Sequence, residues 1–113
     1  MRVIFMGTPA FAVPTLRKLL SSQHVVCRIF TQPDRPSGRG QKITASPIKR
    51  LALESQLPIH QPQELKSVEW KDLLEAIAAD ALVVVAYGKI LPAWLFNLPC
   101  FGAINLHASL LPR

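Results

Sequence analysis

An α/β fold is predicted by three features of the amino-acid sequence. Residues 2 to 6 and 25 to 31 are apolar runs, and the segment between them carries apolar residues at helical spacing. A strand, a helix and a second strand in this order are typical of two parallel strands joined by a right-handed crossover. Residues 80 to 86 are nearly all apolar, as expected of a strand covered on both faces. These features predict a Rossmann-like open parallel sheet with flanking helices.

The same patterns place the remaining elements in chain order. Ser46 and Pro47 are a typical helix N-cap and first helical residue, so a helix should start there. Residues 32 to 46 are rich in proline and glycine, and we expect a long loop without regular structure. The spacing further predicts a helix at residues 9 to 22, a short strand at 57 to 62, a helix at 68 to 79 that buries Leu73, Leu74, Ile77 and Ala78, a short helix at 92 to 98 and a last strand from 102.

The turn after the first strand argues against a dinucleotide cofactor. A dinucleotide-binding fingerprint needs G-x-G-x-x-G so that the backbone can approach a pyrophosphate. Here Gly7 is followed by Pro9 at the second glycine position. A tight turn between strand and helix is enough to explain Gly7, although the turn can still border a ligand.

Composition limits the class of protein further. The chain has 113 residues and is 50% hydrophobic, which suits one folded domain and argues against disorder. It contains no uninterrupted run of about 18 apolar residues and no apolar amino-terminal run of signal-peptide length. Cys27 and Cys100 suggest neither a disulfide framework nor a metal site. We therefore expect a cytoplasmic protein with no membrane contact and no metal.

Positive charge gathers in one segment of the chain. The net charge is +6, and five of the 13 basic residues lie between residues 34 and 50, where Asp34 is the sole acidic residue. A basic segment attracts polyanions, and the glycines beside Arg39 would let its backbone conform to a partner. The alternative is an ordinary solvated surface loop.

Asn105 and His107 are the candidate catalytic residues. Residues 102 to 104 predict a short buried strand, and side chains alternate between the faces of a strand, so Asn105 and His107 should project the same way. Ligands bind beyond the carboxyl ends of strands in open α/β sheets. An amide donor and a titratable imidazole there make a plausible reaction site. A structural role for the pair is the alternative that spacing leaves open.

The segment after the most apolar strand is a candidate ligand pocket. Its sequence is Tyr87-Gly88-Lys89-Ile90-Leu91-Pro92. Apolar groups and exposed backbone at a strand's carboxyl end could hold a flat heterocycle. Ordinary packing of Tyr87, Ile90 and Leu91 fits the spacing equally well.

Several segments together resemble one family. Residues 105 to 112 match the N-x-H-x-S-L-L-P signature of folate-dependent formyltransferases, which purine-pathway, sugar and tRNA formyltransferases share with formyltetrahydrofolate-processing enzymes. Residues 31 to 40 and 46 to 49 look like the insertion loop of the methionyl-tRNA formyltransferases, and residues 7 to 9 and 84 to 88 also resemble that branch. The resemblance covers the whole chain. It implies that residues 1–113 are the amino-terminal portion of a folate-dependent formyltransferase domain, with no second domain.

The resemblance implies transfer of a formyl group from 10-formyltetrahydrofolate to the amino group of methionyl initiator tRNA, a step of translation initiation. Asn105 and His107 would be catalytic, because they can stabilise the oxyanion of a tetrahedral intermediate and handle a proton. Arg35, Arg39 and Lys42 would meet the acceptor end of the tRNA. Folate would be bound by Tyr87, Gly88, Ile90, Leu91, Ser109, Leu110, Leu111 and Pro112.

One part of the family's pattern is missing from this sequence. The family has a catalytic aspartate beyond the S-L-L-P motif, whereas here no acidic residue follows Asp80. We therefore expect a truncated fragment that is inactive or nearly so alone, and a monomeric full-length enzyme. Two other functions stay open: a formyltransferase acting on a small amine, such as a sugar nucleotide or glycinamide ribonucleotide, and a non-catalytic RNA-binding domain.

Overall fold

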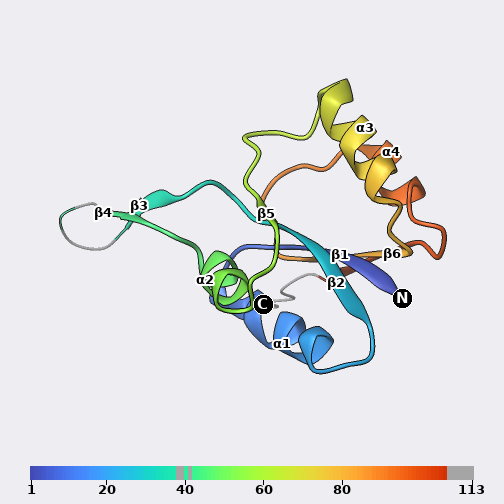
Figure 1. Cartoon of the computed structure of the whole chain (residues 1–113). Helices are drawn as coiled ribbons and strands as arrows, with labels where there is room; N and C mark the ends of the chain where they lie inside the picture. Colours follow the sequence, from blue (N-terminus) through green and yellow to red (C-terminus); the bar gives the residue numbers. More distant parts are fainter. Residues whose placement is uncertain (38–39, 41, 107–113) are drawn as a thin grey trace, which may run out of the picture.

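The fold is built on a five-stranded parallel sheet. The computed structural model describes residues 1–37, 40 and 42–106. The strands are arranged in the order β5-β2-β1-β6-β7 (Figure 1). Their bounds are β1 (Arg2–Gly7), β2 (Val25–Phe30), β5 (Ile59–His60), β6 (Ala81–Val85) and β7 (Ala103–Leu106). The strand order reverses between β1 and β6, which is the point where ligands bind in such sheets. The predicted Rossmann-like parallel sheet is confirmed.

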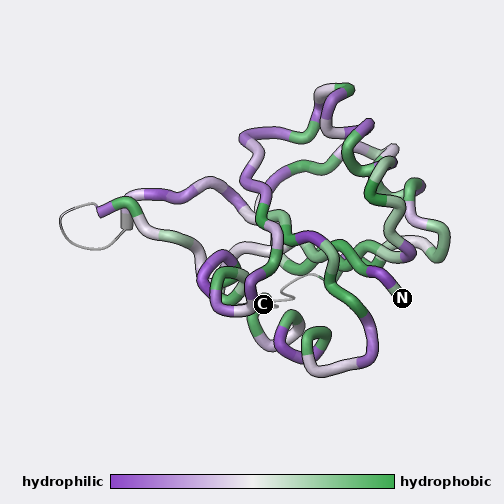
Figure 2. The backbone as a smooth tube through the Cα atoms, in the orientation of Figure 1, coloured by the Kyte–Doolittle hydropathy of each residue, from purple (hydrophilic) through white to green (hydrophobic). Residues whose placement is uncertain are grey.

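Helices cover both faces of the sheet. A 3₁₀ turn, η1 (Ala10–Ala12), leads into α1 (Val13–Leu20), which packs with α2 (Pro47–Glu54) on one face (Figure 1). The other face is covered by α3 (Val68–Ile77) and α4 (Ala93–Asn97). Side chains of β1 and β6 alternate between these two cores, as predicted for the apolar run 80 to 86. Figure 2 shows hydrophobic residues along the strands and hydrophilic ones along the chain that leads into β3.

The end of α3 corrects one predicted core position. The helix stops at Ile77, and Ala78 adopts a left-handed conformation with φ of 53°. A left-handed residue turns the chain out of the helix, so its side chain no longer follows the buried helical face. Ala78 is therefore exposed, whereas Leu74 and Ile77 are buried as predicted.

Residues 32 to 46 contain a hairpin, so the prediction of a loop without regular structure was wrong. Strands β3 (Arg35–Ser37) and β4 (Lys42–Thr44) pair antiparallel, with Arg35 opposite Thr44. Pro36 is tolerated because a two-stranded ribbon consists of edge strands, in which a backbone N–H can be dispensed with. The hairpin projects from the body of the sheet (Figure 1).

The last strand is less buried than predicted. Within residues 1–37, 40 and 42–106, β7 pairs with β6 alone and forms one edge of the sheet. Ile104 is 56% exposed and Leu106 is 44% exposed. An edge strand lacks a neighbour on one side, which leaves its apolar side chains partly uncovered.

The predicted start of α2 is confirmed and can be tested. Ser46 Oγ accepts a hydrogen bond of 3.0 Å from Lys49 N and lies 2.8 Å from the hydroxyl of Thr31, which is fully buried. Ser46→Ala should lower the free energy of unfolding by about 2 kcal/mol, the upper part of the usual range for an N-cap, because Thr31 also loses its partner. Urea unfolding measures this change. Ser55→Ala at the exposed end of the same helix should cost under about 0.5 kcal/mol. Equal losses in the two variants would refute the role of Ser46.

The partly buried ring of His60 should make the stability of the fold depend on pH. The His60 ring lies 4.9 Å from the Phe30 ring and 5.8 Å from the Trp70 ring, and its Nε2 has no hydrogen-bond partner among the described residues. Burial, helped by the charge of Arg28, holds the pKa of His60 below its usual 6.5. The unfolded chain then binds a proton at higher pH than the folded chain does.

The free energy of unfolding should therefore fall as the pH drops from 7 through the lowered pKa of His60. Urea unfolding at pH 7, 6 and 5 measures the slope. His60→Phe keeps an aromatic ring beside Phe30 and Trp70 but removes the titrating group, so its slope should be flatter. An unchanged slope would show that other groups cause the pH dependence.

Candidate functional site

Three loops meet at the carboxyl edge of the sheet. Thr8 follows β1, Gln32 lies just beyond β2, and Tyr87 lies just beyond β6. Thr8 Oγ1 and Gln32 Nε2 each donate a hydrogen bond of 2.9 Å to the main-chain oxygen of Tyr87. Gln32 N in turn donates to Thr8 Oγ1 at 3.3 Å. The loops are thus tied together at the point where the strand order reverses.

Gln32 is the centre of this network and is 6% exposed. Its Oε1 accepts from Arg35 Nη2, and its main-chain oxygen accepts from Gln61 Nε2 at 3.2 Å. A guanidinium group can only donate and a carbonyl oxygen can only accept, so the amide can sit in one orientation alone. Every polar group of Gln32 is engaged with a different segment.

A ligand-sized cavity lies beside this network, on the α4 face of the sheet. Its volume is about 540 Å³, within the range of small-molecule sites. It is lined by Val84, Ala86, Tyr87, Gly88, Lys89, Ile90, Leu91, Phe96 and Asn105. The structure therefore brings together the predicted residues 87, 88, 90, 91 and 105. Because parallel strands end at the same edge, β6 and β7 deliver them to one place.

The loop after β6 has an unusual backbone. Ala86 and Gly88 have φ of 53° and 91°, a region that residues with a side chain rarely adopt. A Cβ on Gly88 would overlap Gln32 Nε2, and no other residue type fits there without moving that amide. Such strained conformations gather at binding and active sites. The three hydrogen-bonded loops hold this one in place.

Tyr87 and Ile90 contribute differently to the cavity. Tyr87 is 2% exposed, and burial raises the pKa of its phenol to about 12, so the hydroxyl stays protonated. Within the described part of the chain this hydroxyl has no hydrogen-bond partner. Ile90 is 98% exposed, which excludes the alternative that it merely packs in the core. Its side chain is free to contact a ligand.

Several predicted site residues lie outside the described residues: Arg39, His107, Ser109, Leu110, Leu111 and Pro112. Arg35 and Lys42 lie on the hairpin and are exposed. The sequence-based prediction assigned neither Thr8 nor Gln32 to the site, and it counted Arg50 only as part of the basic segment. The first two could have been found as polar residues directly after predicted strands, where a parallel sheet collects its functional groups.

Part of the predicted basic segment is neutralised internally. Lys49 Nζ forms an ion pair of 2.9 Å with Asp34. Hydrogen bonds from Lys49 and Gln61 hold the pKa of Asp34 below its usual value. The remaining positive charge of the described segment is carried by Arg35, Lys42 and Arg50. Arg35 and Arg50 line a cavity of about 260 Å³ between the hairpin, Thr8 and the start of α2.

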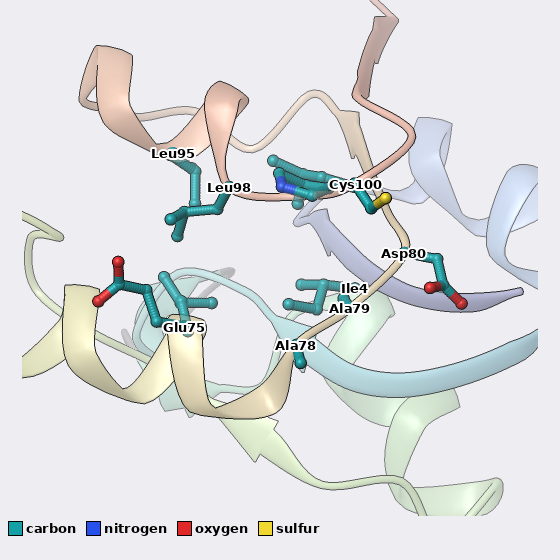
Figure 3. Close-up of a pocket in the computed structure, with 11 residues that line it drawn as sticks. Ile4, Glu75, Ala78, Ala79, Asp80, Leu95, Leu98 and Cys100 are labelled. Atoms are coloured by element: carbon teal, nitrogen blue, oxygen red, sulfur yellow. The ribbon is translucent and has the colours of Figure 1, made fainter.

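A further cavity of about 310 Å³ lies between α3, α4 and the sheet, near the turn at Asp80 that precedes β6 (Figure 3). Leu95 and Leu98 lie together on one side of the cavity, whereas Glu75 and Asp80 lie apart on opposite sides (Figure 3). Polar groups do not converge there, so we assign the site to the carboxyl edge. In residues 1–37, 40 and 42–106, no three His, Cys, Asp or Glu side chains cluster as metal ligands would. No helix in that part of the chain has the length and apolar character to cross a bilayer.

A parallel sheet of this order, with helices on both faces, defines a Rossmann-like α/β domain. A family model described as formyl transferase matches residues 1–113, the whole chain. The chain belongs to the formyl transferase family.

Curated relatives narrow the comparison to one branch of that family. The methionyl-tRNA formyltransferase of Methylococcus capsulatus is 57% identical over 113 residues, and that of Acidobacterium capsulatum is 55% identical over 114 residues. The methionyl-tRNA formyltransferase of Hydrogenovibrio crunogenus is 53% identical over 113 residues. Each match covers all of this chain but only 36–37% of the relative. The chain thus spans little more than a third of these relatives' length.

Proposed function

We propose that residues 1–113 form the amino-terminal portion of the catalytic domain of an enzyme that transfers a formyl group from 10-formyltetrahydrofolate to the amino group of methionyl initiator tRNA. The observation that carries this proposal is the position of Asn105, which lines the same cavity as residues 86–91 at the carboxyl edge of the sheet. The names of the curated relatives support the substrate assignment.

The proposed reaction needs a hydrogen-bond donor beside the formyl oxygen. The methionine amine attacks the formyl carbon, and the bond from that carbon to the folate nitrogen breaks. The amine gives up a proton and the departing nitrogen takes one. After the attack and before the bond to the folate nitrogen breaks, negative charge develops on the formyl oxygen. The amide N–H of Asn105 can stabilise this charge. His107 is the proposed group for moving the proton.

The proposed folate site is the cavity of about 540 Å³. Leu91 and Phe96 offer apolar surface beside the buried Tyr87, Gly88 gives access to the backbone, and Ile90 is exposed at the rim. A flat pteridine suits this mixture of apolar walls and main-chain groups. Ser109, Leu110, Leu111 and Pro112 would complete the site, and no metal is needed.

The proposed contact with RNA is the hairpin of β3 and β4. Arg35 and Lys42 are exposed, and Arg39 lies between them in the chain. Phosphate contacts position an RNA without reading its sequence, which suits an acceptor end. We further propose that the complete polypeptide acts as a cytoplasmic monomer and that residues 1–113 alone are inactive or nearly so.

A hybrid enzyme tests the proposal directly. In the hybrid, residues 1–113 of this chain replace the matching residues of the Methylococcus capsulatus relative. We expect it to formylate methionyl initiator tRNA with 10-formyltetrahydrofolate, since this segment would supply Asn105, His107 and the folate cavity. The relative itself is the matched control.

Three outcomes would contradict the proposal. A folded hybrid that formylates small amines but not the tRNA would favour the small-amine alternative. RNA binding that weakens with salt, without folate binding, would favour a non-catalytic RNA-binding domain. A folded hybrid with none of these activities would overturn the function as a whole.

A further inference from the structure

Gln32 connects the basic hairpin to the proposed folate cavity. On one side its Oε1 accepts from Arg35 Nη2, and on the other its Nε2 donates to the main-chain oxygen of Tyr87 at 2.9 Å. Gln32 is 6% exposed, so its side chain relies on these two partners for its hydrogen bonds. A single amide therefore touches both proposed substrate sites.

The hairpin side of this connection suits a phosphate group. Arg35 and Arg50 line the cavity of about 260 Å³, and no acidic residue pairs with either of them in the described ranges. Nearby hydroxyls are already engaged, since Ser46 bonds Lys49 N and Thr44 Oγ1 donates to Lys42 O. The guanidinium groups of Arg35 and Arg50 are therefore the hydrogen-bond donors available to a phosphate. Arginine has five N–H donors, so Arg35 can bind a phosphate without releasing Gln32.

The loop at residues 86–91 packs against the side-chain amide of Gln32. The amide Nε2 packs against Gly88 so closely that a Cβ there would overlap it. The same nitrogen helps hold the Tyr87 carbonyl between two left-handed residues, Ala86 and Gly88. A shift of the amide would therefore remove one of the two side-chain hydrogen bonds that hold this loop at Tyr87, the other coming from Thr8.

We propose that Gln32 is a positioning residue that makes RNA binding and folate binding favour each other. An RNA phosphate bound to Arg35 fixes the guanidinium group, the guanidinium group fixes the Gln32 amide, and the amide fixes the loop at residues 86–91. Coupling of this kind is reciprocal, so bound folate must strengthen RNA binding by the same factor. This inference rests on the proposed function, because it takes RNA and folate as the two ligands.

The test measures tetrahydrofolate binding to the hybrid enzyme, with and without saturating initiator tRNA that carries no amino acid. No reaction can consume either ligand under these conditions. In the unsubstituted hybrid, we expect the tRNA to lower the Kd for tetrahydrofolate about five-fold, at the low end of usual coupling between sites. The ratio of the two Kd values is the readout.

Gln32→Glu is the decisive variant. Its carboxylate keeps the charge-assisted contact with Arg35 but sets an acceptor against the Tyr87 carbonyl oxygen, so one link breaks and the other stays. We expect the ratio of Kd values to fall to about one, while the tRNA still binds. Gly88→Ala, which displaces the same amide from the other side, should give the same loss of coupling.

Two controls separate coupling from charge and from RNA affinity. Gln23→Glu makes the same chemical change at an exposed position before β2 and should keep the ratio. Arg50→Ala should weaken tRNA binding but also keep the ratio, because the hydrogen bonds of Gln32 to described residues do not include Arg50. A five-fold ratio that survives in Gln32→Glu, or a ratio of one in an unsubstituted hybrid that formylates the tRNA, would overturn the inference and leave the proposed function standing. A folded hybrid that binds neither ligand would instead overturn the proposed function.

Discussion

Replacing Asn105 with aspartate should lower kcat for formyl transfer by the hybrid enzyme about 10²- to 10³-fold. The two side chains have nearly the same shape, but a carboxylate cannot donate a hydrogen bond to the developing oxyanion and repels its charge. Asn105 lies on the edge strand β7 and is exposed, so the change should not disturb the core. Single-turnover kinetics with pre-bound substrates measures the chemical step.

A matched asparagine controls for this substitution. Asn97 is exposed at the end of α4 and does not line the cavity of about 540 Å³. Asn97→Asp adds the same charge and should leave kcat within about two-fold, as for a surface change away from the site. A normal chemical step in Asn105→Asp would remove Asn105 from the proposed mechanism, even if the hybrid remained an active formyltransferase.

Gly7→Ala should lower the free energy of unfolding by about 1–3 kcal/mol, as overpacking in a core does. The added Cβ would lie 2.9 Å from the main-chain oxygen of Val85, 2.9 Å from Phe5 Cε1 and 3.0 Å from Ala12 Cβ. Gly7 pairs with Val85 across β1 and β6, so that oxygen cannot retreat without opening the centre of the sheet. Close packing is therefore a second reason for a glycine at position 7, in addition to the tight turn expected from the sequence.

Urea unfolding measures the loss, and hydrogen exchange locates it. In Gly7→Ala, the amides of β1 and β6 should exchange faster because their pairing is strained. Gly40→Ala is the control for hydrogen exchange, since nothing lies within 4 Å of its added Cβ and the strain at its φ of 82° is local to the hairpin. That variant should leave exchange in β1 and β6 unchanged. Unaltered stability and exchange in Gly7→Ala would show that the sheet absorbs the methyl group freely.

Much of the fold could be predicted because its buried elements have distinctive patterns. The apolar run at residues 80 to 86 indicates a strand covered on both faces, and β6 sends alternate side chains into two cores. Ser46 and Pro47 mark the start of α2 because the cap is a local hydrogen bond. Patterns failed where the neighbours decide the outcome. Pro36 and Gly40 indicate irregular chain, yet Pro36 lies in β3 and Gly40 lies between β3 and β4, which pair with each other. Proline is compatible with this pairing because each strand of a two-stranded ribbon needs only one partner.

The candidate site could also be predicted only in part. Asn105 lies near the carboxyl end of β7, and residues 87 to 91 follow β6. They could be placed together because these strands run parallel, and parallel strands end at one edge. Gln32 was missed because its importance depends on partners far away in the chain. Tyr87 is 55 residues from Gln32, and no local pattern joins them.

By itself, the sequence determined the parallel α/β class, the family resemblance and the positions of the chemical groups that a formyl transfer would use. These properties follow from residue type and short-range spacing, which the chain carries wherever it folds. Only the tertiary structure decided that Ile90 is exposed and does not pack in the core, and that Gln32 joins Arg35 to Tyr87. Such contacts exist only after the strands have paired and their carboxyl ends have come together.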